Sequence, residues 1–170
     1  WFIKLRWAAA AGMAAGGGAA YLLSYDISIP WIAGLTVYLL AANAALLSAS
    51  RFFIGKEAQG FSIRVFTNFQ IFIDWLAVLG LIHITGGVDS PFVFFFFFHI
   101  VMASILLPAQ NMYVNATIAV FFISAVFFLE FAGAISHCSI SGGAGDACSS
   151  AKYVFAYIAS FAIAVYFTVF

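Results

Sequence analysis

Six long runs of apolar residues follow one another along the chain, and short polar stretches separate them. The runs cover residues of about 5–24, 30–50, 65–85, 92–108, 112–133 and 152–170. Each run is close to the roughly 20 residues that a helix needs to cross the hydrocarbon core of a bilayer. The runs are continuously apolar and lack the alternation that is typical of barrel strands. The pattern predicts an all-α, polytopic membrane protein with six transmembrane helices in a single domain over residues 1–170.

The composition supports a membrane protein and argues against a soluble one. Of the 170 residues, 66% are hydrophobic and only 7% are charged, whereas soluble domains are about 25% charged. Six Lys and Arg residues balance six Asp and Glu residues. A net charge of zero gives no electrostatic reason to expect nucleic-acid binding. Because most side chains are hydrophobic, membrane lipid is their expected surrounding.

The basic residues predict how the helices are oriented. Lys4 and Arg6 precede the first run, while Arg51, Lys56 and Arg64 flank the loop between the second and third runs. Basic residues concentrate on the cytoplasmic side of membrane proteins. With six spans, both termini are then cytoplasmic, and we expect a multi-pass protein of the bacterial inner (cytoplasmic) membrane.

The two cysteines lie in a loop over residues 134–151 that is rich in Ser and Gly. The predicted orientation places this loop outside the cytoplasm, where oxidising conditions favour disulfides. We therefore predict a disulfide between Cys138 and Cys148. The alternative, a metal or haem site, lacks both zinc-ligand spacing and the C-x-x-C-H pattern, so no haem or metal is expected.

An ionisable residue inside a transmembrane run is costly and is a candidate for function. At 1.5 Å per residue, Asp74 and His99 lie roughly 16 and 12 Å from the outer ends of their helices. Gln70 and Asp74 share one helix face because they are four residues apart. A hydrogen-bonded pair of Asp74 and His99 would lower the cost of burying both. Such a pair serves either as a tie between helices or as a proton carrier or quinone ligand.

Two further ionisable residues lie near the outer surface. His83 follows Asp74 by nine residues, which is half a turn out of phase, so these two side chains cannot share a face. Glu130 lies at the outer end of the fifth run. His83 and Glu130 are therefore predicted to form a second pair.

The turn between the third and fourth runs has the sequence Thr-Gly-Gly-Val-Asp-Ser-Pro-Phe at residues 85–92. Gly86 and Gly87 permit positive φ angles and a close approach to the backbone. Ser90 can cap the following helix, and Pro91 suits its first position. Free N–H groups at that helix start can bind a quinone carbonyl, but a well-capped hairpin needs the same residues.

The stretch 74–108, with its core at residues 86–92, resembles the transmembrane sensor domain of bacterial redox-sensing histidine kinases of the Reg/Prr type. That family has six spans, cytoplasmic termini and a G-G-x-x-N-P-F heptapeptide in the outer loop between spans three and four, which is implicated in ubiquinone sensing. The match covers Gly86, Gly87, Pro91 and Phe92. It departs at Ser90, where the family has Asn.

The resemblance implies a sensory input module that binds ubiquinone or menaquinone and reports the redox state. The residues proposed for quinone binding are Asp74, His83, Gly86, Gly87, Asp89, Ser90, Pro91, Phe92 and His99. A cytoplasmic output domain is expected after Phe170, and it would act on a response regulator. No catalytic motif occurs in this segment, although the full-length proteins it resembles are protein histidine kinases.

An alternative function is a quinone-binding or structural accessory subunit of a respiratory or photosynthetic membrane complex. A transporter is disfavoured because the two halves of the chain show no internal repeat. Small residues recur at every fourth position of the first run, at Ala8, Gly12, Gly16 and Ala20. Such a face permits close helix contact, within the bundle, in a homodimer or in a larger membrane complex.

Overall fold

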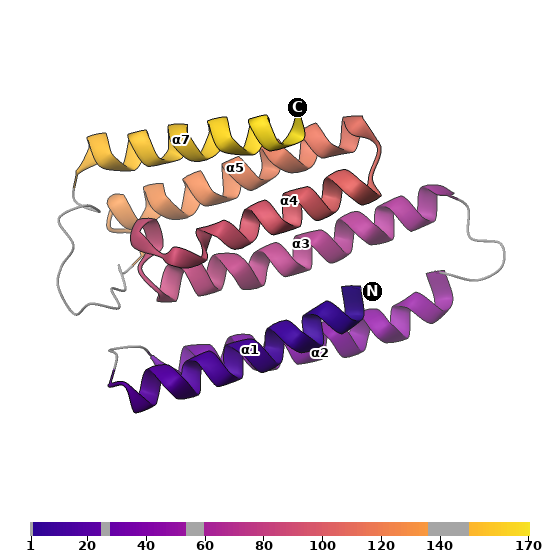
Figure 1. The fold of residues 1–170 in the computed structure, drawn as a ribbon, viewed down its shortest axis with the longest axis horizontal. Helices are drawn as coiled ribbons and strands as arrows, with labels where there is room; N and C mark the ends of the chain where they lie inside the picture. Colours follow the sequence, from indigo (N-terminus) through magenta and orange to yellow (C-terminus); the bar gives the residue numbers. More distant parts are fainter. Residues whose placement is uncertain (1, 25–27, 54–59, 136–149) are drawn as a thin grey trace. The chain divides into compact units, whose positions relative to one another are not determined.

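The described part of the chain is helical in this computed structural model, which describes residues 2–24, 28–53, 60–135 and 150–170 (Figure 1). Two short 3₁₀ helices, η1 (Gly87–Asp89) and η2 (Pro91–Val93), lie in the turn between α3 and α4. The α-helices are α1 (Phe2–Leu22), α2 (Ile29–Phe53), α3 (Gly60–Ile84), α4 (Phe94–Leu106), α5 (Ala109–Phe131) and α7 (Ala151–Val169). The predicted all-α class is confirmed, and each predicted run contains a helix.

Four helices are long and apolar enough to cross a membrane: α2, α3, α5 and α7. Large apolar side chains on these helices are exposed, including Ile163 and Phe167 of α7, as expected where lipid covers the surface. α1 differs because Ala and Gly make up more than half of it and because it carries Lys4 and Arg6. The structure thus supports a membrane protein, while six spans and cytoplasmic termini stay predictions.

α4 is shorter than the predicted span of residues 92–108. It has 13 residues, about 20 Å of α-helix against a hydrocarbon core of about 30 Å. Two prolines set its limits. Ser90 and Leu107, which precede Pro91 and Pro108, both have extended backbones, because a residue before proline avoids the α conformation. The chain therefore enters α4 through a 3₁₀ turn and leaves it at Leu107.

The chain divides into two compact units, residues 1–77 and 78–170, and each is described by itself. The single domain predicted over residues 1–170 stays a prediction. Cys138 and Cys148, with most of the predicted outer loop, lie outside the described residues, so the disulfide also stays a prediction.

In the first unit, α1 packs along α2, and a small buried cluster joins Ala10, Leu39 and Ala77. Gly17 allows the closest approach, since a Cβ at this position would lie 2.7 Å from Cγ2 of Ile32. The face of α1 that packs here differs from the predicted small-residue face. Ala8, Gly12 and Gly16 of that face are exposed.

In the second unit, α4, α5 and α7 pack on one another. Phe96 is fully buried, and its ring meets Phe161 edge-on at a centroid distance of 6.3 Å. Phe127 meets Tyr157 in the same manner at 5.5 Å. Edge-to-face contacts of this kind add to the energy of burial. The aromatic contacts thus join α7 to both α4 and α5.

Candidate functional site

The predicted pair of His83 and Glu130 is present and is confirmed by a distance of 2.7 Å between Nδ1 and Oε1. His83 lies in the last turn of α3, and Glu130 lies at the end of α5. The Glu130 side chain is fully buried, whereas 28% of the His83 side chain is exposed. A buried carboxylate is tolerated when a partner satisfies it, so His83 keeps Glu130 in place.

Gly87 lies against this pair. Its φ of +52° falls in the left-handed region, and a Cβ at this position would overlap the Glu130 carboxylate. Both facts require glycine here. Gly86, with φ of +121°, also needs glycine. The sequence predicted that the glycine pair lets another group approach the backbone, and the approaching group is the protein's own Glu130.

The buried side chains of Thr85 and Ser90 contact each other and so connect the start of the turn to its end. Thr85 Oγ1 donates to the carbonyl of Leu81 at 2.6 Å and lies 2.7 Å from Ser90 Oγ. Ser90 Oγ accepts from the backbone N–H of Phe92 at 3.2 Å. This arrangement confirms the predicted cap, with Pro91 at the first position of η2. Ser90 is buried and holds the turn together, so its hydroxyl is used within the loop.

We call His83, Gly86, Gly87, Ser90 and Glu130 the loop site. Asp89 lies beside it, is exposed and accepts a long hydrogen bond of 3.5 Å from the Tyr153 hydroxyl of α7. Phe92 is partly buried next to Pro91. Seven of the predicted residues thus occupy one end of α3 and the turn after it: His83, Gly86, Gly87, Asp89, Ser90, Pro91 and Phe92.

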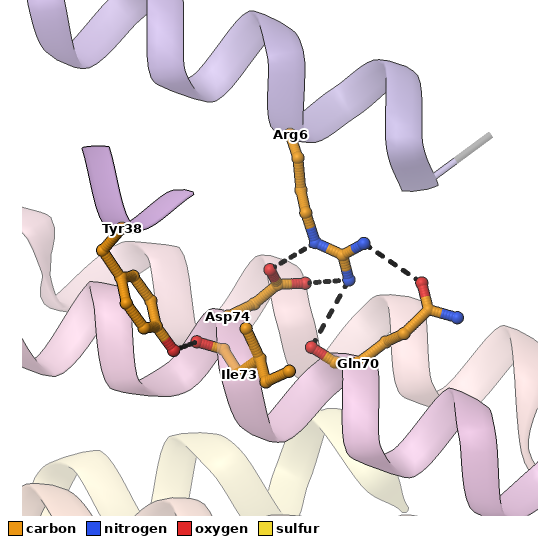
Figure 2. A network of polar contacts seen from close by, with 5 residues as sticks. All are labelled: Arg6, Tyr38, Gln70, Ile73 and Asp74. Carbon is orange, nitrogen blue, oxygen red and sulfur yellow. Dashed lines mark hydrogen bonds and ion pairs between the residues drawn. The ribbon is translucent and has the colours of Figure 1, made fainter. Parts of the chain in front are cut away.

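Asp74 belongs to the first unit and His99 to the second, so their predicted pair stays a prediction, and within its own unit each has another partner. The Nδ1 atom of His99 lies 2.7 Å from the carbonyl oxygen of Phe95, one turn back in α4. Asp74 binds Arg6 (Figure 2).

Arg6 makes a buried network with α3, which sequence reasoning missed (Figure 2). Its Nε and Nη2 atoms donate to Oδ1 and Oδ2 of Asp74 at 2.6 and 2.9 Å. Its Nη1 atom donates to Oε1 of Gln70 at 3.1 Å, and Nη2 reaches the Gln70 carbonyl at 3.4 Å. Two parallel bonds between guanidinium and carboxylate are the strong form of this contact.

Arg6 was predicted to precede the first span and to help set orientation; the structure instead buries it within the first unit, and the orientation itself stays a prediction. Only 4% of Arg6 and 5% of Asp74 is exposed. A third helix reaches the same place, because the Tyr38 hydroxyl of α2 donates to the carbonyl of Ile73 at 3.0 Å. The available signal was the deep carboxylate itself, which requires a cation nearby. We call Arg6, Tyr38, Gln70 and Asp74 the arginine network.

Comparisons of the chain with protein-family models, with curated proteins and with solved structures found no match.

Proposed function

We propose that this chain is the membrane-embedded input module of a signalling protein and that it binds a membrane quinone at the loop site. The observation that carries the proposal is the His83 ring. It is partly exposed, and its Nδ1 atom is fixed on the buried carboxylate of Glu130 at 2.7 Å. The ring therefore offers its Nε2 edge in a defined direction.

The chemistry of a quinone headgroup suits such a ring. A quinone carbonyl accepts a hydrogen bond, and the hydroxyl of a quinol also donates one. Neutral histidine with a proton on Nδ1 donates to Glu130 and accepts at Nε2, while the protonated ring donates from both nitrogens. One side chain can thus bind both redox forms.

The neighbouring turn supports the same ligand. Gly87 lets the Glu130 carboxylate lie against the backbone of the turn, so the turn positions the His83–Glu130 pair. Phe92, which follows the turn, is partly buried and offers an apolar surface. The matches to the redox-sensing histidine kinases at Gly86, Gly87, Pro91 and Phe92 add weight. The departure at Ser90 matters less, because its hydroxyl is used to close the turn.

In the proposed protein, six spans lie in a bacterial inner membrane with both termini cytoplasmic. The redox state of the quinone changes how the ends of α3 and α5 pack, and an output domain after Phe170 passes this change to a response regulator. The reading frame distinguishes this function from that of an accessory subunit. A coiled coil and kinase domain encoded beyond Phe170 supports the sensor, whereas a stop codon favours the subunit.

The binding test compares two matched histidine substitutions. In His83→Asn, the amide nitrogen replaces Nδ1 and can still donate to Glu130, but nothing replaces Nε2. His99→Asn makes the same change in α4, where Nδ1 bonds to the backbone of its own helix. Short-chain ubiquinone and menaquinone analogues are titrated into the detergent-purified chain, and quenching of tryptophan fluorescence reports binding.

Loss of one hydrogen bond of about 1 kcal/mol weakens binding about fivefold. We expect this loss in His83→Asn and no change in His99→Asn. Lipid extracts of the purified chain are expected to contain quinone. If neither analogue binds and the extracts lack quinone, or if both variants bind as the parent does, the loop site is not a quinone site.

A further inference from the structure

All three helices of the first unit meet at one turn of α3. Arg6 of α1 contacts Gln70 and Asp74, and Tyr38 of α2 contacts the backbone at Ile73 (Figure 2). Both ends of the ion pair are almost fully buried. The turn lies within a helix that is apolar enough to cross a membrane. An ion pair in such a place has little access to water, so each charge depends on the other.

α1 is the helix that most needs this contact. It is absent from the four described helices that are apolar enough to span, and its first two turns carry Lys4 and Arg6. It packs along α2 through small residues such as Ala10 and Gly17, whereas toward α3 it offers the small cluster of Ala10 with Ala77 and the long side chain of Arg6. Apolar packing alone therefore binds α1 only weakly to α3.

The groups that face Asp74 identify its counter-ion. Among the described residues of the first unit, Arg6 approaches it from α1, Tyr38 from α2 and Gln70 from its own helix. The Tyr38 hydroxyl is a neutral donor to the Ile73 carbonyl, and the Gln70 side chain is neutral. Arg6 is thus the cation that balances Asp74, and Asp74 is the anion that balances Arg6.

We propose that the Arg6–Asp74 pair is a charge-dependent latch that docks α1 on α3. With both groups charged, α1 is docked. When Asp74 is neutral, the guanidinium is left without a counter-charge, and it moves toward water, where arginine side chains extend when they can. Because Arg6 lies near the start of α1, the first turns of this helix leave α3 with it. The latch does not depend on what binds at the loop site.

Hydrogen exchange of the full chain in lipid nanodiscs, read by mass spectrometry, tests the latch. Asp74→Asn removes the charge and keeps the shape of the side chain. We expect peptides from α1 to exchange about tenfold faster in this variant, while peptides from α7 keep the exchange rate of the parent. The matched control is Asp89→Asn, which makes the same change at an exposed carboxylate and leaves α1 unchanged.

A double substitution separates the charge pair from a general loss of structure. Arg6→Met with Asp74→Leu removes both charges and fills similar volume, so protection of α1 returns to that of the parent. If Asp74→Asn raises exchange in α7 as well as in α1, the double variant alone tests the latch. Restored protection of α1 in the double variant then supports the latch. Unchanged exchange of α1 in Asp74→Asn overturns the proposal, as does a double variant in which α1 stays unprotected.

Discussion

Replacing Gly87 with alanine tests the geometry of the loop site most directly. Two separate costs fall on this one position. The φ angle of +52° is unfavourable for any residue with a Cβ, and the new methyl group would overlap the Glu130 carboxylate. The second cost depends on Glu130, so it can be separated from the first. Gly133 provides the matched control, because its φ is +70° and nothing lies within 4 Å of a Cβ there.

The magnitudes of the two costs follow from these contacts. A left-handed backbone costs alanine about 1–2 kcal/mol, and this is the whole effect expected at Gly133. At Gly87 the methyl group also pushes Glu130 away from His83. Losing one partner of a buried pair costs about 3–5 kcal/mol. His83 is partly exposed, so about 2–3 kcal/mol is the better value for this pair, and the total for Gly87→Ala is about 3–5 kcal/mol.

Thermal unfolding in detergent measures the difference. For a chain of this length, 1 kcal/mol changes Tm by about 2–4 °C. We expect Gly87→Ala to lower Tm at least twice as much as Gly133→Ala. In a Glu130→Ala background the overlap is gone, and Gly87→Ala then costs no more than Gly133→Ala does. Equal losses of Tm for the two glycine variants, or an excess that persists without Glu130, would refute the packing of Glu130 on Gly87.

Two further predictions concern polar contacts elsewhere in the two units. Ser90→Ala removes the cap on Phe92 and the contact with Thr85, and we expect a loss of about 1–2 kcal/mol in unfolding free energy, while Ser90→Thr keeps the hydroxyl and most of the stability. Tyr38→Phe removes one hydrogen bond to a backbone carbonyl and is expected to cost about 1 kcal/mol. Its loss of Tm should be smaller than that of Asp74→Asn, and an equal or larger loss would contradict the role given to the ion pair.

Local sequence patterns predicted the elements and the turn because each depends on neighbouring residues. Long apolar runs gave helices, and the prolines at 91 and 108 explain why α4 is shorter than its run. Gly86 and Gly87 have the positive φ angles that paired glycines suggested. The His83–Glu130 pair was also predictable, since both residues lie near helix ends that the topology places on the same side.

The arginine network could not be predicted in the same way. A basic residue at the start of an apolar run is typical of a membrane flank, and hydropathy gives Arg6 no other role. Its true partner is 68 residues away in the sequence, and only the packing of α1 beside α3 brings the two together.

The helix face on which a buried ionisable group lies, in addition to its depth, indicates which partner it can reach. Asp74 and His83 are nine residues apart on α3, so their side chains point half a turn away from each other. Two ionisable groups on opposite faces of one apolar helix need partners from different helices. The structure gives Asp74 its partner from α1 and His83 its partner from α5. The partner of a carboxylate or imidazole inside a predicted span should therefore be sought first among charges that the same helix face can reach. By this rule Arg6 is a candidate partner for Asp74, even though Arg6 lies at a helix start.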